Sequence, residues 1–199
     1  EDVIRAQPRS RGLGDVYKRQ VNEITKMFND NTAVITAYNG IPWWYFFNIG
    51  GQFNNYRFKC IDPDNIQWKL ITPERIIGCV VYPATEIIQP GVIKHLEGNR
   101  FSLGEPSGIQ SERVSIISKA LVRANLKAPI RNNIRQEIWM KLIGNLAFNP
   151  LSVITGETLE VLLSKEENKK IAYAAMQEAS LIMNKLNIPL NISIDQRIE

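Results

Sequence analysis

Short apolar runs in the first part of the chain predict buried strands. Residues 32–37 (TAVITA) and 75–84 (RIIGCVVYPA) are rich in β-branched side chains and end in turn or proline signals, which is typical of strands in a sheet core. Residues 91–106 predict two further short strands, joined across Gly98 and Asn99. Residues 125–130 (NLKAPI) form another strand candidate.

A helical period replaces the strand pattern further along the chain. Ser111 is placed to cap an amphipathic helix formed by the residues that follow it. From residue 133 onward the pattern is helical with almost no strand signal, and Thr158 is placed to cap a later helix. We therefore expect an α/β domain over residues 21–131 and an all-helical domain over residues 132–199.

One helical segment combines a nearly continuous apolar surface with three polar residues. At about 100° per residue, Lys141, Asn145 and Asn149 fall on one narrow stripe, and no charged residue follows Lys141 before Glu157. A helix that is apolar nearly all round is buried, so these polar groups must face a polar cleft or find partners in the core. This stripe is the candidate functional site.

Two interpretations of the stripe are open on the pattern alone. Either it forms a ladder of interhelical hydrogen bonds beside a lysine whose ammonium reaches solvent, or it serves a ligand. Pro150 favours a ligand, because it should end or kink the helix at Asn149 and free backbone groups near a cleft. We also expect Trp139 and Leu142, on the apolar arc, to be buried.

Charge and composition argue against several classes of protein. The chain carries 24 basic and 20 acidic residues, and residues 1–20 hold five of the basic and three of the acidic ones. The remainder is close to neutral, so we expect no nucleic-acid partner. Hydrophobic residues make up 44% of the chain, which is typical of a globular protein, and the apolar runs are too short to span a bilayer. We therefore expect no membrane partner.

Cysteine and histidine usage gives no indication of a metal site or a disulfide framework. Cys60 and Cys79 lack metal-ligand spacing and lie in apolar or strand-like surroundings. We interpret them as buried free thiols in a reducing compartment, the cytoplasm. His95, the single histidine, lies in a strand-like segment and is interpreted as a half-exposed sheet residue.

Residues 10–20 (SRGLGDVYKRQ) follow neither hydrophobic period. One legal coding of this stretch matches an adapter oligonucleotide used in transposase-based sequencing libraries. We therefore interpret residues 1–20 as a non-native, adapter-derived segment and expect native sequence to begin near Val21. The competing interpretation is a basic N-terminal arm.

The stripe and its surroundings resemble a known family. Residues 137–156 (EIWMKLIGNLAFNPLSVITG) are similar to the signature of the ketopantoate reductases, which runs W-x-K-L-x-x-N-x-x-x-N-P at the entry to their helical domain. The AYNG stretch at 37–40, residues 90–105 and the R-x-x-I-R-x-E-I-W approach to the stripe fit the same family in the same order.

This resemblance implies a fold and an activity. The fold is the C-terminal part of a Rossmann-type domain followed by a helical domain like that of 6-phosphogluconate dehydrogenase, with the chain truncated at both ends. The activity is NADPH-dependent reduction of a 2-oxo acid, such as 2-dehydropantoate, to the 2-hydroxy acid, in pantoate synthesis. The resemblance also implies a cytoplasmic enzyme, with a homodimer as one assembly open to it.

The resemblance further implies roles for four residues. Lys141 matches the general acid that protonates the ketone oxygen, and Asn145 and Asn149 match the amides that hold the substrate. Asn39 matches the asparagine near the nicotinamide end of the cofactor. The residue types suit these roles, because hydride addition builds negative charge on oxygen and a partly desolvated ammonium is a suitable proton donor.

The chain also departs from the family pattern. It contains no G-x-G-x-x-G phosphate turn and no residue known to select NADP over NAD, so we expect this stretch alone to be inactive. Trp43, Trp44 and Tyr45 stand where the family has smaller residues, and core packing explains them better than ring stacking. The alternatives are a reductase of a different 2-oxo acid and a non-catalytic packing or dimerisation module.

Overall fold

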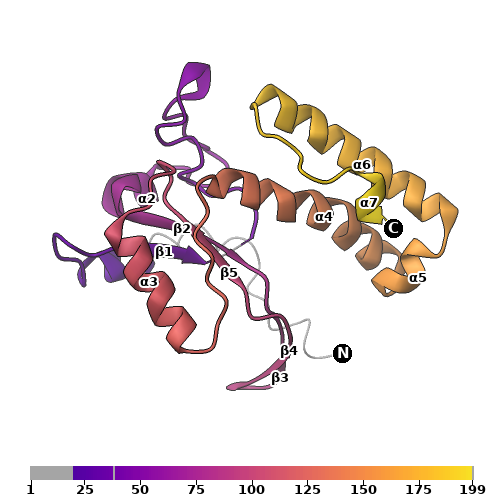
Figure 1. Cartoon of the computed structure of the whole chain (residues 1–199), viewed down its shortest axis with the longest axis horizontal. Helices are drawn as coiled ribbons and strands as arrows, with labels where there is room; N and C mark the ends of the chain where they lie inside the picture. Colours follow the sequence, from indigo (N-terminus) through magenta and orange to yellow (C-terminus); the bar gives the residue numbers. More distant parts are fainter. Residues whose placement is uncertain (1–19, 38, 199) are drawn as a thin grey trace. The chain divides into compact units, whose positions relative to one another are not determined.

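The protein is described from a computed structural model that places residues 20–37 and 39–198 (Figure 1). The prediction that residues 1–20 are non-native falls, except for Gln20, outside the described residues. The described residues divide into two compact units, one comprising residues 20–36 and 42–77 and the other residues 37, 39–41 and 78–198. The domain boundary expected after residue 131 stays a prediction.

The first unit is built around an aromatic core. Its regular elements are helical residues 20–25, most of β1 (Val34–Ala37), η3 (Gly51–Phe53), α2 (Ile66–Leu70) and η4 (Pro73–Arg75). Trp43, Trp44 and Tyr45 are all buried, and the Trp44 indole N–H donates to Thr36 Oγ1 at 3.0 Å. The packing role expected for these aromatic residues is confirmed.

Two antiparallel pairs of strands follow. β2 (Ile76–Val81) pairs with β5 (Phe101–Gly104) in a three-stranded sheet of order β1-β2-β5, and β3 (Ala84–Gln89) pairs with β4 (Val92–Glu97). The strands predicted on either side of Gly98 are therefore present but do not pair with each other. Gly98 has a φ of +72°, and a Cβ there would lie 3.1 Å from the Tyr82 carbonyl oxygen, so glycine lets the chain turn from the hairpin into β5.

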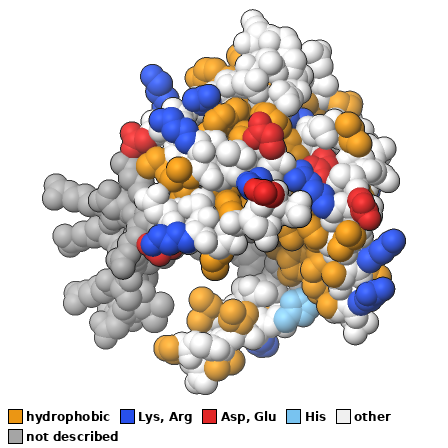
Figure 2. All heavy atoms as spheres, turned by 90° about the vertical axis from the view of Figure 1, so that its left-hand side faces the viewer, with side chains coloured by type: hydrophobic (Ala, Val, Ile, Leu, Met, Phe, Trp, Pro, Cys, Tyr) orange, Lys and Arg blue, Asp and Glu red, His pale blue; other side chains and the backbone are white. Residues whose placement is uncertain are grey.

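Strand β3 has no counterpart in the sequence-based expectation. Its residues are almost all exposed, so no buried face imposes the alternating pattern of a half-buried strand. Apolar side chains are exposed on this hairpin (Figure 2), and more than half of the surface of each of the following is accessible: Ile87, Ile88, Ile93 and Leu96. His95 is an exposed residue of β4, more open than the half-exposed position expected for it.

Residues 125–130 contribute less regular structure than predicted. They make two isolated parallel bridges, Lys127 with Arg100 and Ile130 with Leu103. The prediction of a strand along the whole segment is wrong, because Pro129 has no backbone N–H to donate and interrupts the ladder.

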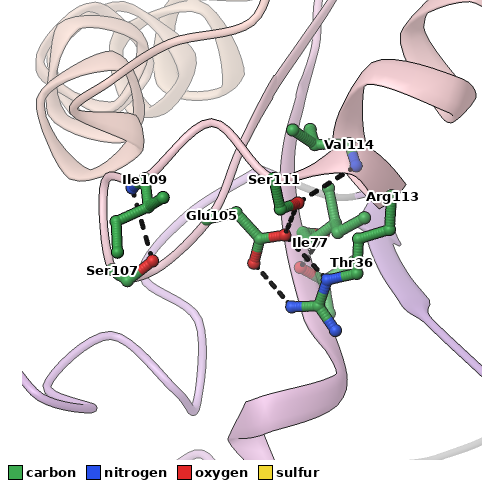
Figure 3. Close-up of polar contacts among 8 residues, drawn as sticks. All are labelled: Thr36, Ile77, Glu105, Ser107, Ile109, Ser111, Arg113 and Val114. Atoms are coloured by element: carbon green, nitrogen blue, oxygen red, sulfur yellow. Dashed lines mark hydrogen bonds and ion pairs between the residues drawn. The ribbon is translucent and has the colours of Figure 1, made fainter. Parts of the chain in front are cut away.

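Helix α3 (Glu112–Arg123) begins at the predicted cap. Ser111 Oγ accepts from the Val114 N–H at 3.2 Å, and the Ser111 hydroxyl donates to Glu105 Oε1 at 2.5 Å. Arg113 donates to both Glu105 oxygens, at 2.7 and 2.5 Å (Figure 3). Because Glu105 is 5% exposed, a buried carboxylate, its cation and a helix cap form one local unit.

The remaining elements are helical: α4 (Ile134–Thr155), α5 (Leu159–Leu163), α6 (Glu166–Lys185) and α7 (Asp195–Ile198). α4 packs against α5 and α6 (Figure 1), with Ile143, Leu162 and Met176 fully buried. Strands and α3 followed by a run of helices confirm the predicted α/β plus all-helical fold class. None of the described helices combines the length and apolarity needed to cross a membrane.

α4 continues through Pro150 and ends at Thr155. The sequence predicts an end or a kink of the helix at Asn149; the end is wrong, and the kink stays a prediction. Proline costs the helix a backbone hydrogen bond, but its fixed φ is compatible with helical backbone, and buried Leu151 anchors the turn that follows. Gly156, with a φ of +69°, is the residue that ends α4.

The apolar arc of α4 and the two cysteines show where burial differs from expectation. Trp139 is buried as predicted, whereas Leu142 is half-buried. Cys79 is buried on β2, and burial raises the pKa of its thiol to about 11. Cys60 is exposed, so its predicted burial is wrong, because it lies in a turn rather than in a strand.

Candidate functional site

Lys141 extends from α4 and contacts the end of β2. Asn133 caps α4 by accepting from the Gln136 N–H at 3.1 Å. The half-buried Lys141 donates from Nζ to the Val81 carbonyl, and Nζ lies 4.7 Å from the centroid of the Tyr82 ring. Burial, together with the positive charge of a nearby arginine, lowers the pKa of Lys141 below its usual value. This ammonium therefore releases a proton more readily than an exposed lysine does.

The three residues of the stripe line one pocket of about 650 Å³. Lys141 and Asn145 are half-buried and Asn149 is exposed, so α4 presents one ammonium and two amides along the pocket wall. The structure thus brings together the residues that the helical period places on one face. Their chemical roles stay predictions.

Asn39 lies apart from this group. It is exposed in the bend that follows β1 and does not line the pocket around Lys141. The next residue, Gly40, has a φ of +99° and open space where a Cβ would be. The cofactor role of Asn39 stays a prediction.

An ionic cluster in the pocket wall escapes the sequence pattern. Glu137 Oε1 accepts from the Tyr82 hydroxyl at 2.8 Å and from the Ser102 hydroxyl at 2.7 Å. Arg131 Nε lies 3.3 Å from Glu137 Oε2, and the Arg100 guanidinium carbon lies 3.7 Å from the Tyr82 ring centroid. Burial and the bond to Glu137 raise the pKa of Tyr82 to about 12.

The sequence pattern does not predict this cluster, because its members come from distant parts of the chain. Tyr82 follows β2, Arg100 precedes β5 and Ser102 lies within β5, and no local period connects them. Glu137 and Arg131 stand in the R-x-x-I-R-x-E-I-W approach to the stripe. That motif is the signal in the sequence from which part of the cluster could be found.

Arg197, on α7, adds another cation to the pocket. Its guanidinium donates to the Met140 carbonyl, and a Cβ at Gly144 would lie 3.4 Å from its Nη2, so glycine leaves room for the arginine. Burial lowers the pKa of Arg197 below its usual value. Among the described residues that line the pocket there are four cations and one carboxylate, which suits an anionic ligand.

Comparison with known sequences identifies relatives of this chain. Residues 133–199 match the family described as ketopantoate reductase PanE/ApbA C terminal. A 2-dehydropantoate 2-reductase from Mesorhizobium japonicum is 46% identical over 179 residues, which are 90% of this chain and 55% of that protein. The chain therefore spans about half the length of the curated relative it matches.

Comparison with solved structures extends the similarity to the fold. A candidate ketopantoate reductase from Ralstonia solanacearum MolK2 gives a TM-score of 0.87 at 32% identity, over 93% of this chain and 57% of that one. D-mandelate dehydrogenase, solved with NADH and anilino(oxo)acetate, gives a TM-score of 0.72 at 17% identity, over 92% of this chain and 52% of that one. The second likeness concerns the fold alone. Taken together, these similarities show that residues 133–199 match the C-terminal part of the ketopantoate reductase family and that the chain resembles members of that family over most of its own length.

Proposed function

We propose that the protein containing this chain reduces a 2-oxo acid to the corresponding 2-hydroxy acid, with a reduced nicotinamide cofactor as hydride donor. The observation that carries the proposal is Lys141, a half-buried ammonium with a lowered pKa that shares a pocket with Asn145 and Asn149. Similarity to the ketopantoate reductases supports the class of reaction. 2-Dehydropantoate as substrate and NADPH as cofactor are the specific forms that the resemblance implies.

Lys141 acts as the general acid in this proposal. A bound nicotinamide supplies the hydride. As the carbonyl carbon of the substrate accepts it, the π electrons of the C=O bond move to oxygen, and Lys141 Nζ transfers a proton to that oxygen. Lys141 is left as a neutral amine and recovers its proton from water. The lowered pKa favours this transfer, which a guanidinium that keeps its proton could not make.

The other polar groups of the pocket hold the substrate. Asn145 and Asn149 each offer a donor and an acceptor, which suit a carboxylate or hydroxyl oxygen and fix the carbonyl relative to Lys141. The excess of cations over carboxylates along the wall favours the negative charge of a 2-oxo acid. Asn39 is the residue of this chain that we assign to the nicotinamide.

Location and assembly belong to the same proposal. We assign the protein to the cytoplasm, where the buried thiol of Cys79 stays reduced. We assign it to a homodimer, for which exposed apolar side chains of α6 such as Leu181 and Ile182 offer contact area.

Turnover by the full-length protein tests the function. The protein is mixed with NADPH or NADH and, in separate reactions, 2-dehydropantoate, phenylglyoxylate and pyruvate, and the near-ultraviolet absorbance of the reduced nicotinamide is followed. Consumption of the cofactor with formation of the 2-hydroxy acid supports the proposal, and relative rates identify the substrate. A folded protein that consumes no cofactor with any 2-oxo acid would favour the non-catalytic packing module.

A further inference from the structure

Glu137 and Lys141 are spaced to form a salt bridge, and they do not form one. They lie four residues apart on α4, with glutamate on the N-terminal side, which is the favourable orientation for an ion pair on a helix. In the described structure the Lys141 ammonium instead donates to the Val81 carbonyl. The sequence spacing would allow a salt bridge between Glu137 and Lys141. In the structure each of the two side chains instead has its own partners.

The Glu137 carboxylate is held away from Lys141 by groups on other elements. Oε1 accepts from the Tyr82 and Ser102 hydroxyls, and Oε2 lies 3.3 Å from Arg131 Nε. Arg100 Nη2 is 3.9 Å from Oε1. The side chain is 15% exposed, so little water competes for these contacts.

Tyr82 connects this carboxylate to the ammonium. Its hydroxyl donates to Glu137, while its ring contacts Arg100 at 3.7 Å and Lys141 at 4.7 Å, both measured to the centroid. An aromatic face stabilises a cation without offering it a full negative charge. Glu137 therefore fixes the orientation of the ring on which Lys141 lies.

We propose that Glu137 is a positioning residue for Lys141, held by Tyr82, Ser102 and Arg131 so that it orients the aromatic face beside the ammonium and stays out of a salt bridge with it. The inference rests on the proposed function only in naming Lys141 the proton donor. The arrangement of charges can be measured without any reaction.

This arrangement matters because a carboxylate paired with Lys141 would favour its charged form and make it a weaker acid. The titratable and charged groups that line the pocket with Lys141 are Tyr82, Arg100, Arg131, Glu137 and Arg197. Glu137 is the single carboxylate among these described groups, and its direction decides whether Lys141 faces negative charge or a ring.

Two variants of opposite expected effect test the inference. Tyr82→Phe combined with Ser102→Ala keeps the ring and every charge but removes both hydroxyl donors, so Glu137 Oε1 is free to turn toward Lys141. We expect the pKa of Lys141 to rise by about one unit. Glu137→Gln removes the carboxylate and leaves Arg100 and Arg131 uncompensated, so we expect the pKa of Lys141 to fall by roughly half a unit.

The measurement is an NMR titration of the full chain labelled with ¹³C at lysine Cε. Lys141→Arg identifies the Lys141 resonance by its loss, and thermal unfolding by circular dichroism checks that each variant folds. Should the double variant not fold, Tyr82→Phe alone removes one donor and is expected to raise the pKa by a smaller amount.

Opposite shifts support the positioning role, because loosening of the pocket alone would move both variants the same way. Shifts of the same sign, or no shift in folded variants, would overturn it. Failure of the proposed function appears separately, as a full-length protein that titrates as expected and reduces no 2-oxo acid.

Discussion

Two carboxylates in the second unit have similar partners and different surroundings. Glu105 is bonded to a serine hydroxyl and an arginine, and Glu137 is bonded to a serine and a tyrosine hydroxyl with an arginine nearby. The partners of Glu105 lie six and eight residues away. Those of Glu137 include residues 35 and 55 positions away.

The difference separates a structural ion pair from one that serves a site. The Glu105 contacts join the end of β5 to the first turn of α3, through Ser111 and Arg113. The Glu137 contacts gather groups from β5, the end of β2 and α4 around a pocket that also contains Lys141. We expect the Glu105 region to control stability and the Glu137 region to control chemistry.

The largest effect should come from Lys141→Ala in the full-length protein. It removes the proton donor needed as the alkoxide forms, so we expect turnover to fall by roughly a hundredfold or more with the fold intact. Lys119→Ala, an exposed lysine of α3, is the matched control and should keep normal turnover. Steady-state kinetics and thermal unfolding on the same preparations separate the outcomes. Near-normal turnover in Lys141→Ala would contradict the catalytic role of Lys141, and with it the expectation that the Glu137 region controls chemistry.

Arg113→Ala should lower the stability of the protein and leave turnover unchanged. It leaves Glu105 buried without its cation, and because Arg113 is itself 37% exposed, we expect a loss of about 2 kcal/mol, below the full cost of breaking a buried pair. Urea unfolding measures the loss, with Arg123→Ala on the same helix as control. Turnover per folded molecule should not change, and a fall in it would show that the Glu105 region also serves the site.

The pH dependence of reduction should report Lys141. Proton donation needs the charged ammonium, so turnover should be level at low pH and fall about tenfold per pH unit above the pKa of Lys141. Because that pKa is lowered, the fall should begin below 10.5, the ordinary value for lysine. Rate profiles with saturating substrate measure it. A profile level up to pH 10.5 would contradict the assignment.

Asn145→Ala should give the smallest of these effects. The variant loses one neutral hydrogen bond to the substrate, worth about 1 kcal/mol, so we expect KM to rise about fivefold with little change in kcat. Asn168→Ala on α6, remote in sequence, is a control for loss of an amide. If kcat fell and KM did not, Asn145 would contribute to the transition state rather than to binding.

The local sequence pattern predicts the features that depend on neighbouring residues alone, such as the faces and the caps of helices. Lys141, Asn145 and Asn149 share a face because α4 repeats every 3.6 residues, and the caps at Ser111 and Thr158 follow from side-chain oxygens that bond the first turn of a helix.

Contacts between residues far apart in the sequence, and strands that are exposed on both faces, cannot be predicted from the local sequence pattern. Tyr82 and Arg197 reach the pocket through tertiary packing, which leaves no period in the sequence. Strand β3 escaped because neither of its faces is consistently buried. The predicted helix end at Asn149 is wrong because proline disfavours a helix interior only on average, and here buried Leu151 packs the turn that follows Pro150.

The contrast between the two cysteines gives the protein a ready attachment point for a spectroscopic label. A thiol whose pKa is about 11 is almost entirely protonated at neutral pH, and thiolate is the form that reacts with maleimides and iodoacetamides. Buried Cys79 is therefore shielded both by the surrounding side chains and by its own protonation, whereas Cys60 is exposed. A fluorophore or spin label added to the unmodified sequence under mild conditions would be directed to Cys60 in the first unit, without any cysteine having to be engineered in or out.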